Sequence, residues 1–327
     1  MSLVGIIANP ASGKDIRRIV AFGSVFDNQE KVRIVRRILL GLRAAEVDRV
    51  AYMPDYYGIV ERALDGLEID LRVERLQFPT HADQRDSTAA ARLLRERGAG
   101  CIVTLGGDGT NRVTAKESGT VPILPLSTGT NNVFPVMIEG TVAGLAAGLV
   151  ATGRVSVSDG TFRSTRLEVL VDGLLADIAL VDAVVCDDPF LGSRAVWKTE
   201  TIRYVFLNRA SPDSIGFSSI GGMFELLKPE DPRGICLELG KGGRTVTAPV
   251  APGVIESVGV ARQSTLSLDE PSPIRFRPCV LALDGEREVE VKKSQEVSVR
   301  VAARGPVVVD VRKTMAAAMT SGELLGQ

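Results

Sequence analysis

The first 150 residues alternate short β-branched apolar runs with segments of helical periodicity. Apolar residues spaced three and four positions apart predict helices over Glu30–Ala45 and Tyr57–Leu67, and a third that Asp86 or Ser87 caps and Gly98 ends. The apolar runs predict strands over Leu3–Ala8, Val47–Met53, Leu71–Phe78, Cys101–Leu105 and Val121–Leu126. Such alternation is typical of a parallel sheet with helices on both faces.

The pattern changes near residue 150, after a predicted helix of small residues over Gly140–Thr152. The segments that follow are short, β-rich and interrupted by Gly, Pro or Asp: Arg166–Asp172, Ala176–Cys186, Gly234–Leu239, Thr245–Ala248, Val254–Ala261, Thr265–Leu268, Val280–Leu283, Val289–Val291 and Val297–Val301. This arrangement is typical of a β-sandwich. We therefore expect an α/β Rossmann-like domain over residues 1–150 and an all-β sandwich-like domain over 151–303. A tail over 304–327, with a helix at Thr314–Met319, is expected to pack back on the first domain.

The charge of the chain is balanced, with 39 basic and 40 acidic residues among 327 and a formal net charge of -1. No overall basic field favours a nucleic-acid partner. The opening residues lack the basic segment of a signal peptide, and no apolar run approaches the roughly 20 residues that span a bilayer. We expect a cytoplasmic protein with no nucleic-acid partner and no membrane span.

The cysteines and the only histidine carry little catalytic signal. Cys101, Cys186, Cys236 and Cys279 lie far outside metal-clip spacing, so we interpret them as reduced, mostly buried thiols. Any histidine-based nucleophile activation or metal site would depend on His81 alone. Its polar surroundings favour a solvated loop or a substrate contact.

The most informative segment is Gly106–Thr110, which reads Gly-Gly-Asp-Gly-Thr and follows a predicted strand. Glycines let the backbone approach a ligand closely, and consecutive N–H groups near a helix start form a cradle for anions. Asp108 would repel a phosphate in that cradle unless a cation lies between them or the carboxylate accepts a proton. Phosphate, Mg²⁺ and a carboxylate base are the components of a phosphoryl-transfer site. Alone, the loop could equally be a tight turn with a solvated aspartate.

A second polar loop, Asn9–Asp15, directly follows the first predicted strand. Asn9 and Gly13 can shape a phosphate-facing turn, and Lys14 offers a point charge for a β- or γ-phosphate. The loop lacks the spacing of a Walker A motif. By itself it would be interpreted as a surface turn.

A third loop follows the strand predicted to end at Leu126. Its Thr128, Gly129 and Asn131 supply a hydroxyl, a close backbone approach and an amide for phosphate or ribose oxygens. A polar loop that caps the next helix is the simpler interpretation of this segment alone. Because ligands of α/β sheets bind beyond the carboxyl ends of the strands, three such loops together predict one nucleotide site.

The sequences Asn-Pro-Ala-Ser-Gly-Lys, Gly-Gly-Asp-Gly-Thr and Pro-Leu-Ser-Thr-Gly-Thr-Asn resemble motifs of the NAD kinase and diacylglycerol/sphingosine kinase superfamily. Its members pair a Rossmann-like domain with a β-sandwich and transfer the γ-phosphoryl group of ATP to a substrate hydroxyl. The resemblance implies ATP and Mg²⁺ as cofactors, and Asp108 as the catalytic base or a Mg²⁺ ligand. The nucleotide site that it implies consists of Asn9, Gly13, Lys14, Gly106, Gly107, Gly109, Thr110, Thr128, Gly129 and Asn131.

Further resemblance lies in the second half of the chain. Segments 166–169 and 179–185 resemble two strands of NAD kinases, Ser218–Gly222 resembles their Ser-Ala-Gly-Gly turn, and Leu283–Glu286 resembles an Asp-Gly turn of both branches. The opening of the chain is most similar to the acetoin-catabolism protein X subgroup. The acceptor contacts that the resemblance implies are Asp182, Ser219, Gly221 and Gly222.

The leading hypothesis is an ATP- and Mg²⁺-dependent kinase that acts on a small-molecule hydroxyl, most simply that of NAD. The resemblance also implies a homo-oligomer. A lipid or small-alcohol kinase is the alternative enzyme, although Thr130 stands where that branch usually has asparagine. A non-catalytic nucleotide-binding regulator is the alternative of another class, because Val181-Asp182 replace the Asn-Glu pair of NAD kinases.

Overall fold

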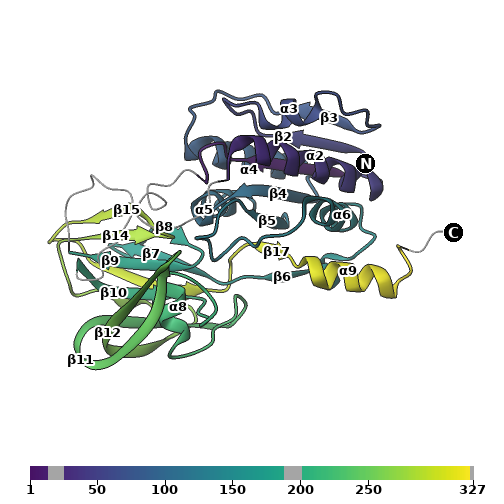
Figure 1. Cartoon of the computed structure of the whole chain (residues 1–327). Coiled ribbons are helices and arrows are strands. Elements are labelled where there is room, and N and C mark those ends of the chain that lie inside the picture. The colour runs from purple at the N-terminus through teal and green to yellow at the C-terminus, as the bar shows by residue number, and fades with distance from the viewer. Residues whose placement is uncertain (14–25, 188–200, 325–327) are drawn as a thin grey trace.

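The computed structural model describes residues 1–13, 26–187 and 201–324. It contains an α/β domain and a β-rich domain, which lie side by side (Figure 1). The sequence-based expectation of a Rossmann-like α/β fold followed by an antiparallel β-sandwich is confirmed. None of the helices within the described ranges is long and apolar enough to cross a membrane.

The α/β domain is built on a seven-stranded sheet with the order β3-β2-β1-β4-β5-β17-β6. Its strands are β1 Leu3–Ala8, β2 Arg49–Tyr52, β3 Arg72–Arg75, β4 Cys101–Gly106, β5 Ile123–Ser127, β6 Thr161–Arg163 and β17 Val307–Val309. All neighbouring strands pair in parallel except β6, which runs antiparallel to β17. The carboxyl ends of β1, β4 and β5 therefore meet at one edge of the sheet.

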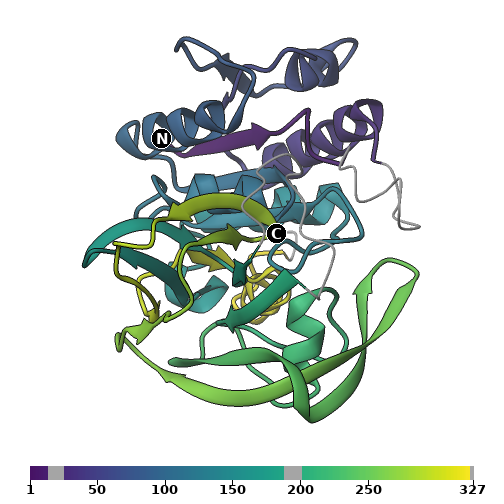
Figure 2. The same ribbon diagram turned by 90° about the vertical axis from the view of Figure 1, so that its left-hand side faces the viewer.

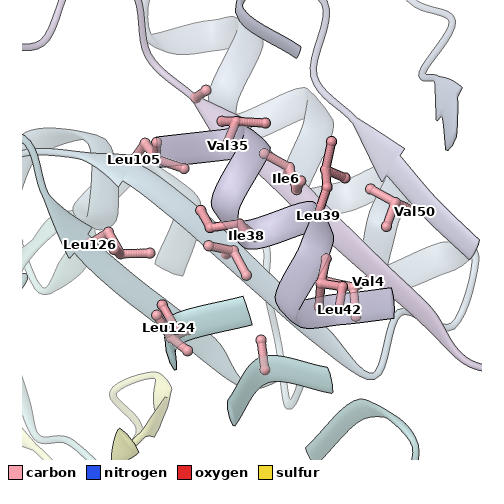
Figure 3. Close-up of a cluster of buried hydrophobic side chains, with 14 of the residues drawn as sticks. Val4, Ile6, Val35, Ile38, Leu39, Leu42, Val50, Leu105, Leu124 and Leu126 are labelled. Carbon is pink, nitrogen blue, oxygen red and sulfur yellow. The ribbon is translucent and has the colours of Figure 1, made fainter. Parts of the chain in front are cut away.

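Helices cover both faces of this sheet: α2 Asn28–Ala44, α3 Ile59–Leu64 and α6 Gly140–Ala151 on one, α4 Gln84–Glu96 on the other. Alternate residues of β1 divide between the two cores, so Val4 and Ile6 pack with α2 while Leu3 and Ile7 pack with α4. Figure 3 shows the first of these cores, with Leu39 of α2 beside Ile6.

The helix of small residues, α6, packs closely against α2, as its composition predicts. A Cβ atom built on Gly144 of α6 would collide with the main-chain oxygen of Ile38 in α2, and one on Gly41 of α2 would collide with that of Thr141. The two helix backbones are thus in direct contact, which only glycine permits.

The predicted cap of α4 is wrong. Asp83 is the N-cap, because its extended backbone lets its side chain accept the N–H of Arg85 at 2.9 Å. Asp86 instead accepts the N–H groups of His81 and Ala82, each at 2.8 Å, and so fixes the loop before the helix.

The β-rich domain consists of a six-stranded sheet, β12-β11-β10-β9-β14-β15, and a four-stranded sheet, β13-β16-β7-β8. Their strands are β7 Arg166–Val171, β8 Leu174–Ala179, β9 Asp182–Cys186, β10 Ile202–Leu207, β11 Arg233–Ala251, β12 Val254–Ser267, β13 Ser272–Pro273, β14 Cys279–Leu283, β15 Glu286–Val291 and β16 Val297–Ala302. Val169 of one sheet and Phe206 and Leu281 of the other share a core between the sheets. The short helix α8 Phe217–Gly222 covers the outer face of the larger sheet through Ile220.

The strands of this domain differ from the predicted ones in three respects. The single strand expected over Ala176–Cys186 is two strands, β8 and β9, which belong to different sheets because the chain crosses over at Leu180-Val181. The segments expected as four strands between 234 and 268 form the two long strands β11 and β12, and neither β10 nor the two-residue strand β13 was predicted. In Figure 2 the long β11–β12 ribbon lies on the side of the β-rich domain away from the seven-stranded sheet.

The chain enters and leaves the β-rich domain through the α/β sheet. Residue 150 lies in the last turn of α6, after which α7 Val157–Gly160 and β6 continue the α/β domain. After β16 the chain returns as β17 and the helix α9 Val311–Thr320, where Ala318 packs against Leu149 and Val155 (Figure 1). The four cysteines are free and buried.

Candidate active site

The three polar loops meet at the carboxyl edge of the α/β sheet. Asn9, after β1, donates through its side-chain amide to the hydroxyl of Thr110 at 2.9 Å. The hydroxyl oxygens of Ser12 and Thr128 lie 3.0 Å apart and link the first loop to the third. Lys14 lies outside the described residues.

Asp108 occupies the first position of helix α5 Asp108–Ala115, directly after the N-cap Gly107. Its Oδ1 accepts the N–H of Phe134 at 2.7 Å and that of Val133 at 3.1 Å, so the half-buried carboxylate is held by the third loop. A negative group here faces the positive end of the helix dipole. The loop therefore presents a fixed carboxylate among N–H groups that favour anions.

Each glycine of this loop has a side chain of a different neighbour close to its Cα atom. A Cβ on Gly106 would lie 2.5 Å from the Thr110 hydroxyl oxygen, and one on Gly107 would lie 2.8 Å from Oδ1 of Asn132. A Cβ on Gly109 would lie 2.9 Å from Oε1 of Glu286. The Cβ side of each glycine is therefore filled by a side chain of the protein itself, and the loop packs closely against all three neighbours.

The third loop is stabilised from within. The Ser127 hydroxyl donates to the main-chain oxygen of Gly129 at 2.7 Å, and the Asn132 amide donates to Ser127 Oγ at 2.7 Å. Thr128 is buried next to the first loop, and Asn131 is half-buried beside Asn132. Thr128, Gly129 and Asn131 thus lie in the loop that also holds Asp108.

Lys31 is a buried lysine that the sequence analysis assigned no role. Its side chain has no exposed surface, and its Nζ donates to the main-chain oxygens of Asn9 at 2.8 Å and Ser12 at 2.6 Å. It also donates to Oδ1 of Asn28 at 3.1 Å. A signal was present, because Lys31 falls on the apolar face of α2, four residues before Val35.

Arg112, one helical turn after Asp108, is also fully buried. Its guanidinium lies 3.2 Å from Asp177 Oδ2, 3.8 Å from Asp284 Oδ2 and 3.6 Å from Glu286 Oε2. These three carboxylates belong to β8, the β14–β15 turn and β15. Helix α5 of one domain is therefore tied by charge to the other domain. In the sequence, the position of Arg112 four residues after Asp108 is the feature that places it near the candidate site.

Asp284 is buried at the centre of this network. It accepts the N–H of Leu180 at 2.9 Å and that of Val181 at 2.8 Å, which fixes the crossover between β8 and β9. Burial raises the pKa of Asp284 to about 6, and the Arg112 guanidinium opposes that rise.

A second buried arginine, Arg209, lies near Asp108. The guanidinium carbon of Arg209 lies 4.8 Å from the centroid of the Phe134 ring, and Nη2 donates to Ser164 Oγ at 2.8 Å. Burial lowers the pKa of Arg209 to about 10, against the opposing influence of Asp108 and Asp284. The guanidinium thus stays protonated at neutral pH and places a positive charge near Asp108.

A cavity of about 620 Å³ opens beside the cradle. Its walls come from the first loop, from Gly109 and Thr110, from the segment after β2 and from residues 80–87. Glu286 of the β-rich domain completes the wall. The volume is that of a typical small-molecule site.

Comparison with known proteins gives the family. Residues 4–155 match the model of the ATP-NAD kinase N-terminal domain, and residues 165–304 match that of the acetoin catabolism protein X C-terminal domain. The chain is 41% identical over 311 residues to acetoin catabolism protein X of Cupriavidus necator, which covers 91% of this chain and 87% of that protein. The chain belongs to the acetoin catabolism protein X family. The resemblance drawn from the loops is confirmed.

In this acetoin catabolism protein X family member, the four proposed acceptor residues lie in two places. Asp182 begins β9 and is buried, and its backbone N–H donates to Asp284 Oδ1 at 3.3 Å, so its main chain is held by the β14–β15 turn. Ser219, Gly221 and Gly222 form part of α8, a short helix where a turn was expected.

The contacts of those three residues lie within the β-rich domain. Ser219 Oγ donates to the main-chain oxygen of Gly216 at 2.7 Å, and a Cβ on Gly222 would collide with the backbone of Ser211. These contacts account for both residue types by packing, and an acceptor role for them stays a prediction.

The donor set of the cradle suits a magnesium ion that arrives with a nucleotide. Within the described ranges, no group of three or more His, Cys, Asp and Glu side chains could hold a metal ion alone. Magnesium is usually held by one or two carboxylates together with substrate phosphates and water. Asp108 and Glu286, on either side of Gly109, are the carboxylates that fit this arrangement.

Proposed function

We propose that this protein is a phosphotransferase that moves the γ-phosphoryl group of ATP to a substrate hydroxyl, with NAD as the leading acceptor. The observation that carries the proposal is the position of Asp108, a carboxylate fixed at the start of α5 inside a glycine cradle. The match of residues 4–155 to the ATP-NAD kinase N-terminal domain supports it.

The cradle residues have separate tasks in this proposal. The N–H groups of Gly106–Thr110 and the start of α5 bind phosphate oxygens, and the first and third loops complete the site through Asn9 and Thr128. Magnesium, when bound with the nucleotide, would neutralise phosphate charge and be held by Asp108 or Glu286. Arg209 adds positive charge near the same point.

The chemical step needs little base strength. The acceptor oxygen forms a bond to the γ-phosphorus while the bond from that phosphorus to the β–γ bridging oxygen breaks, and ADP leaves. The hydroxyl proton passes to the carboxylate of Asp108. Because the transition state is loose, positioning of the two oxygens contributes more than basicity.

The cavity favours a polar ligand over a lipid. Charged side chains line it, among them Asp55, Arg75 and Arg85. A lipid kinase would need an apolar cleft for its acceptor. Val181-Asp182 stand where NAD kinases have Asn-Glu, so one amide that would read the NAD ribose is absent and the assay compares several acceptors.

The test is a phosphoryl-transfer assay with γ-labelled ATP and Mg²⁺, offered NAD, NADH, a short-chain diacylglycerol or no acceptor. Label in NADP supports the proposal, and chelation of Mg²⁺ should abolish it. Label in the lipid would instead make the protein a lipid kinase. Tight MgATP binding without transfer to any acceptor would contradict the proposal and favour a nucleotide-binding regulator.

A further inference from the structure

We propose that Arg112 is a positioning residue that holds Glu286 against the phosphate cradle, across the boundary between the two domains. The effect of this positioning on catalysis rests on the function proposed above. The positioning of Glu286 by Arg112 is a property of the folded chain and can be tested without activity.

The carboxylate of Glu286 lies between Arg112 and Gly109. Oε2 lies 3.6 Å from Nη2 of Arg112, and a Cβ on Gly109 would lie 2.9 Å from Oε1 and 3.4 Å from Oε2. The side chain of Glu286 is 44% exposed, so one oxygen is directed at the buried arginine while the carboxylate still borders the cavity. Arg112 therefore determines where this carboxylate lies relative to the cradle.

The backbone that carries Glu286 is held by the same arginine. Asp284 and Gly285 both have positive φ angles, 51° and 82°, and form the tight turn between β14 and β15. Asp284 faces Arg112 with one oxygen at 3.8 Å and accepts N–H groups of the β8–β9 crossover. Loss of the guanidinium would thus loosen both the turn and the side chain that follows it.

Arginine is the residue type that this geometry requires. A planar guanidinium has five N–H donors in a fixed fork and can face several carboxylates at once. A lysine at the same place would keep the charge but reach fewer of the three acceptors. Because Arg112 lies one turn from Asp108 on α5, the same helix positions both carboxylates that border Gly109.

Lys116 provides a matched control. It lies one turn further along the same helix segment, and its Nζ lies 2.7 Å from Asp177 Oδ1, so it shares one carboxylate partner with Arg112. Its ion pair is with Asp177 and not with the turn at residues 284–286. A purely stabilising role of charge at this boundary would make the two residues equivalent, whereas a positioning role would distinguish them, because Arg112 faces Glu286 and Lys116 faces Asp177.

The experiment compares the whole wild-type chain with Arg112→Lys and Lys116→Met, by hydrogen–deuterium exchange and by steady-state transfer kinetics. In Arg112→Lys, amides of the 283–286 turn should exchange about tenfold faster, whereas Lys116→Met should match the wild type. The kcat/KM of Arg112→Lys for MgATP should fall about tenfold or more, because a carboxylate that borders the cradle is displaced, whereas that of Lys116→Met should match the wild type.

Unchanged exchange at the turn in Arg112→Lys would overturn the inference, and so would an equal effect of Lys116→Met. If the wild type transfers no phosphoryl group, the proposed function fails, but faster exchange in Arg112→Lys alone would still support positioning. If Arg112→Lys does not fold, Asp284→Asn removes the charge that faces the arginine. Its turn should also exchange faster, and wild-type exchange in that variant would overturn the inference.

Discussion

The ammonium group of Lys31 donates a 2.8 Å hydrogen bond to the main-chain oxygen of Asn9, although the two residues lie in different elements at the edge of the sheet. With the bond to Ser12 O at 2.6 Å, it directs two carbonyl groups of the first loop inward. A loop whose carbonyls point inward is arranged to present other groups to a ligand. Lys31 thus stabilises the conformation of the first loop of the candidate nucleotide site.

Replacing this lysine should damage the first loop selectively. Lys31→Met keeps a chain of similar length but removes the ammonium donor to the main-chain oxygens of Asn9 and Ser12 and to Oδ1 of Asn28. We expect a loss of about 1–3 kcal/mol in the free energy of unfolding and weaker MgATP binding. Calorimetry and thermal unfolding measure both. Arg33→Met, at an exposed position of the same helix, should leave both unchanged, and equal effects of the two variants would contradict this role.

A side chain at Gly107 should close the cradle. In Gly107→Ala the new Cβ would lie 2.8 Å from Oδ1 of Asn132, so the amide must shift and the third loop with it. We expect MgATP affinity to fall about tenfold, equal to about 1.4 kcal/mol. Gly173→Ala is the control, because a Cβ at that hairpin turn meets nothing within 4 Å and its positive φ should lower stability alone. If Gly107→Ala and the wild type bind MgATP with equal affinity, the Gly106–Thr110 loop is not part of the nucleotide site.

The buried carboxylate of Glu168 should govern part of the acid stability of the β-rich domain. Burial alone would raise the pKa of Glu168, but hydrogen bonds from Arg166 and Arg300 outweigh it and hold the pKa below its ordinary value of 4.5. The stabilisation is therefore complete above about pH 4.5 and is lost as the pH falls through the lower pKa of the folded state.

The variant Glu168→Gln tests this assignment. At pH 7 it should lose about 2–3 kcal/mol, less than the 3–5 kcal/mol expected for a fully buried pair, because both arginines are partly exposed. The difference from wild type should shrink as the pH falls below 4, as measured by denaturant unfolding across a pH series. A difference that stays constant with pH would contradict the assignment.

The features of the candidate site that depend on neighbouring residues in the sequence were easier to predict than those that depend on residues far apart in the sequence. The glycine and hydroxyl content of the three loops, and their place after β1, β4 and β5, follow from local pattern and from the rules of parallel sheets. Neighbouring strand ends then bring the loops together without further information. Local pattern therefore suffices to place Asn9, Asp108 and Thr128 at one edge of the sheet.

The buried cations were missed because their partners are distant in sequence. Arg112 contacts Asp177 and Asp284 only in the folded chain, where α5 packs against the β-rich domain. The spacing of apolar residues along the sequence does not predict such a contact. The split of the predicted strand over Ala176–Cys186 has the same cause, since Asp284 holds the crossover N–H groups from about a hundred residues away. The cap of α4 was predicted wrongly for a local reason. Asp83 and Asp86 are both suited to cap the helix, but Asp83 has the extended backbone of an N-cap and Asp86 binds the preceding loop.

The most direct measurement is label transfer from γ-labelled ATP to NAD by wild type and Asp108→Asn, with the thermal midpoint of each. The asparagine oxygen can still accept the N–H groups of Val133 and Phe134, so the variant should fold and melt near the wild type. Because its amide cannot take the hydroxyl proton, turnover should fall by about 10²–10⁴. Near-wild-type turnover in a folded Asp108→Asn protein would contradict the account.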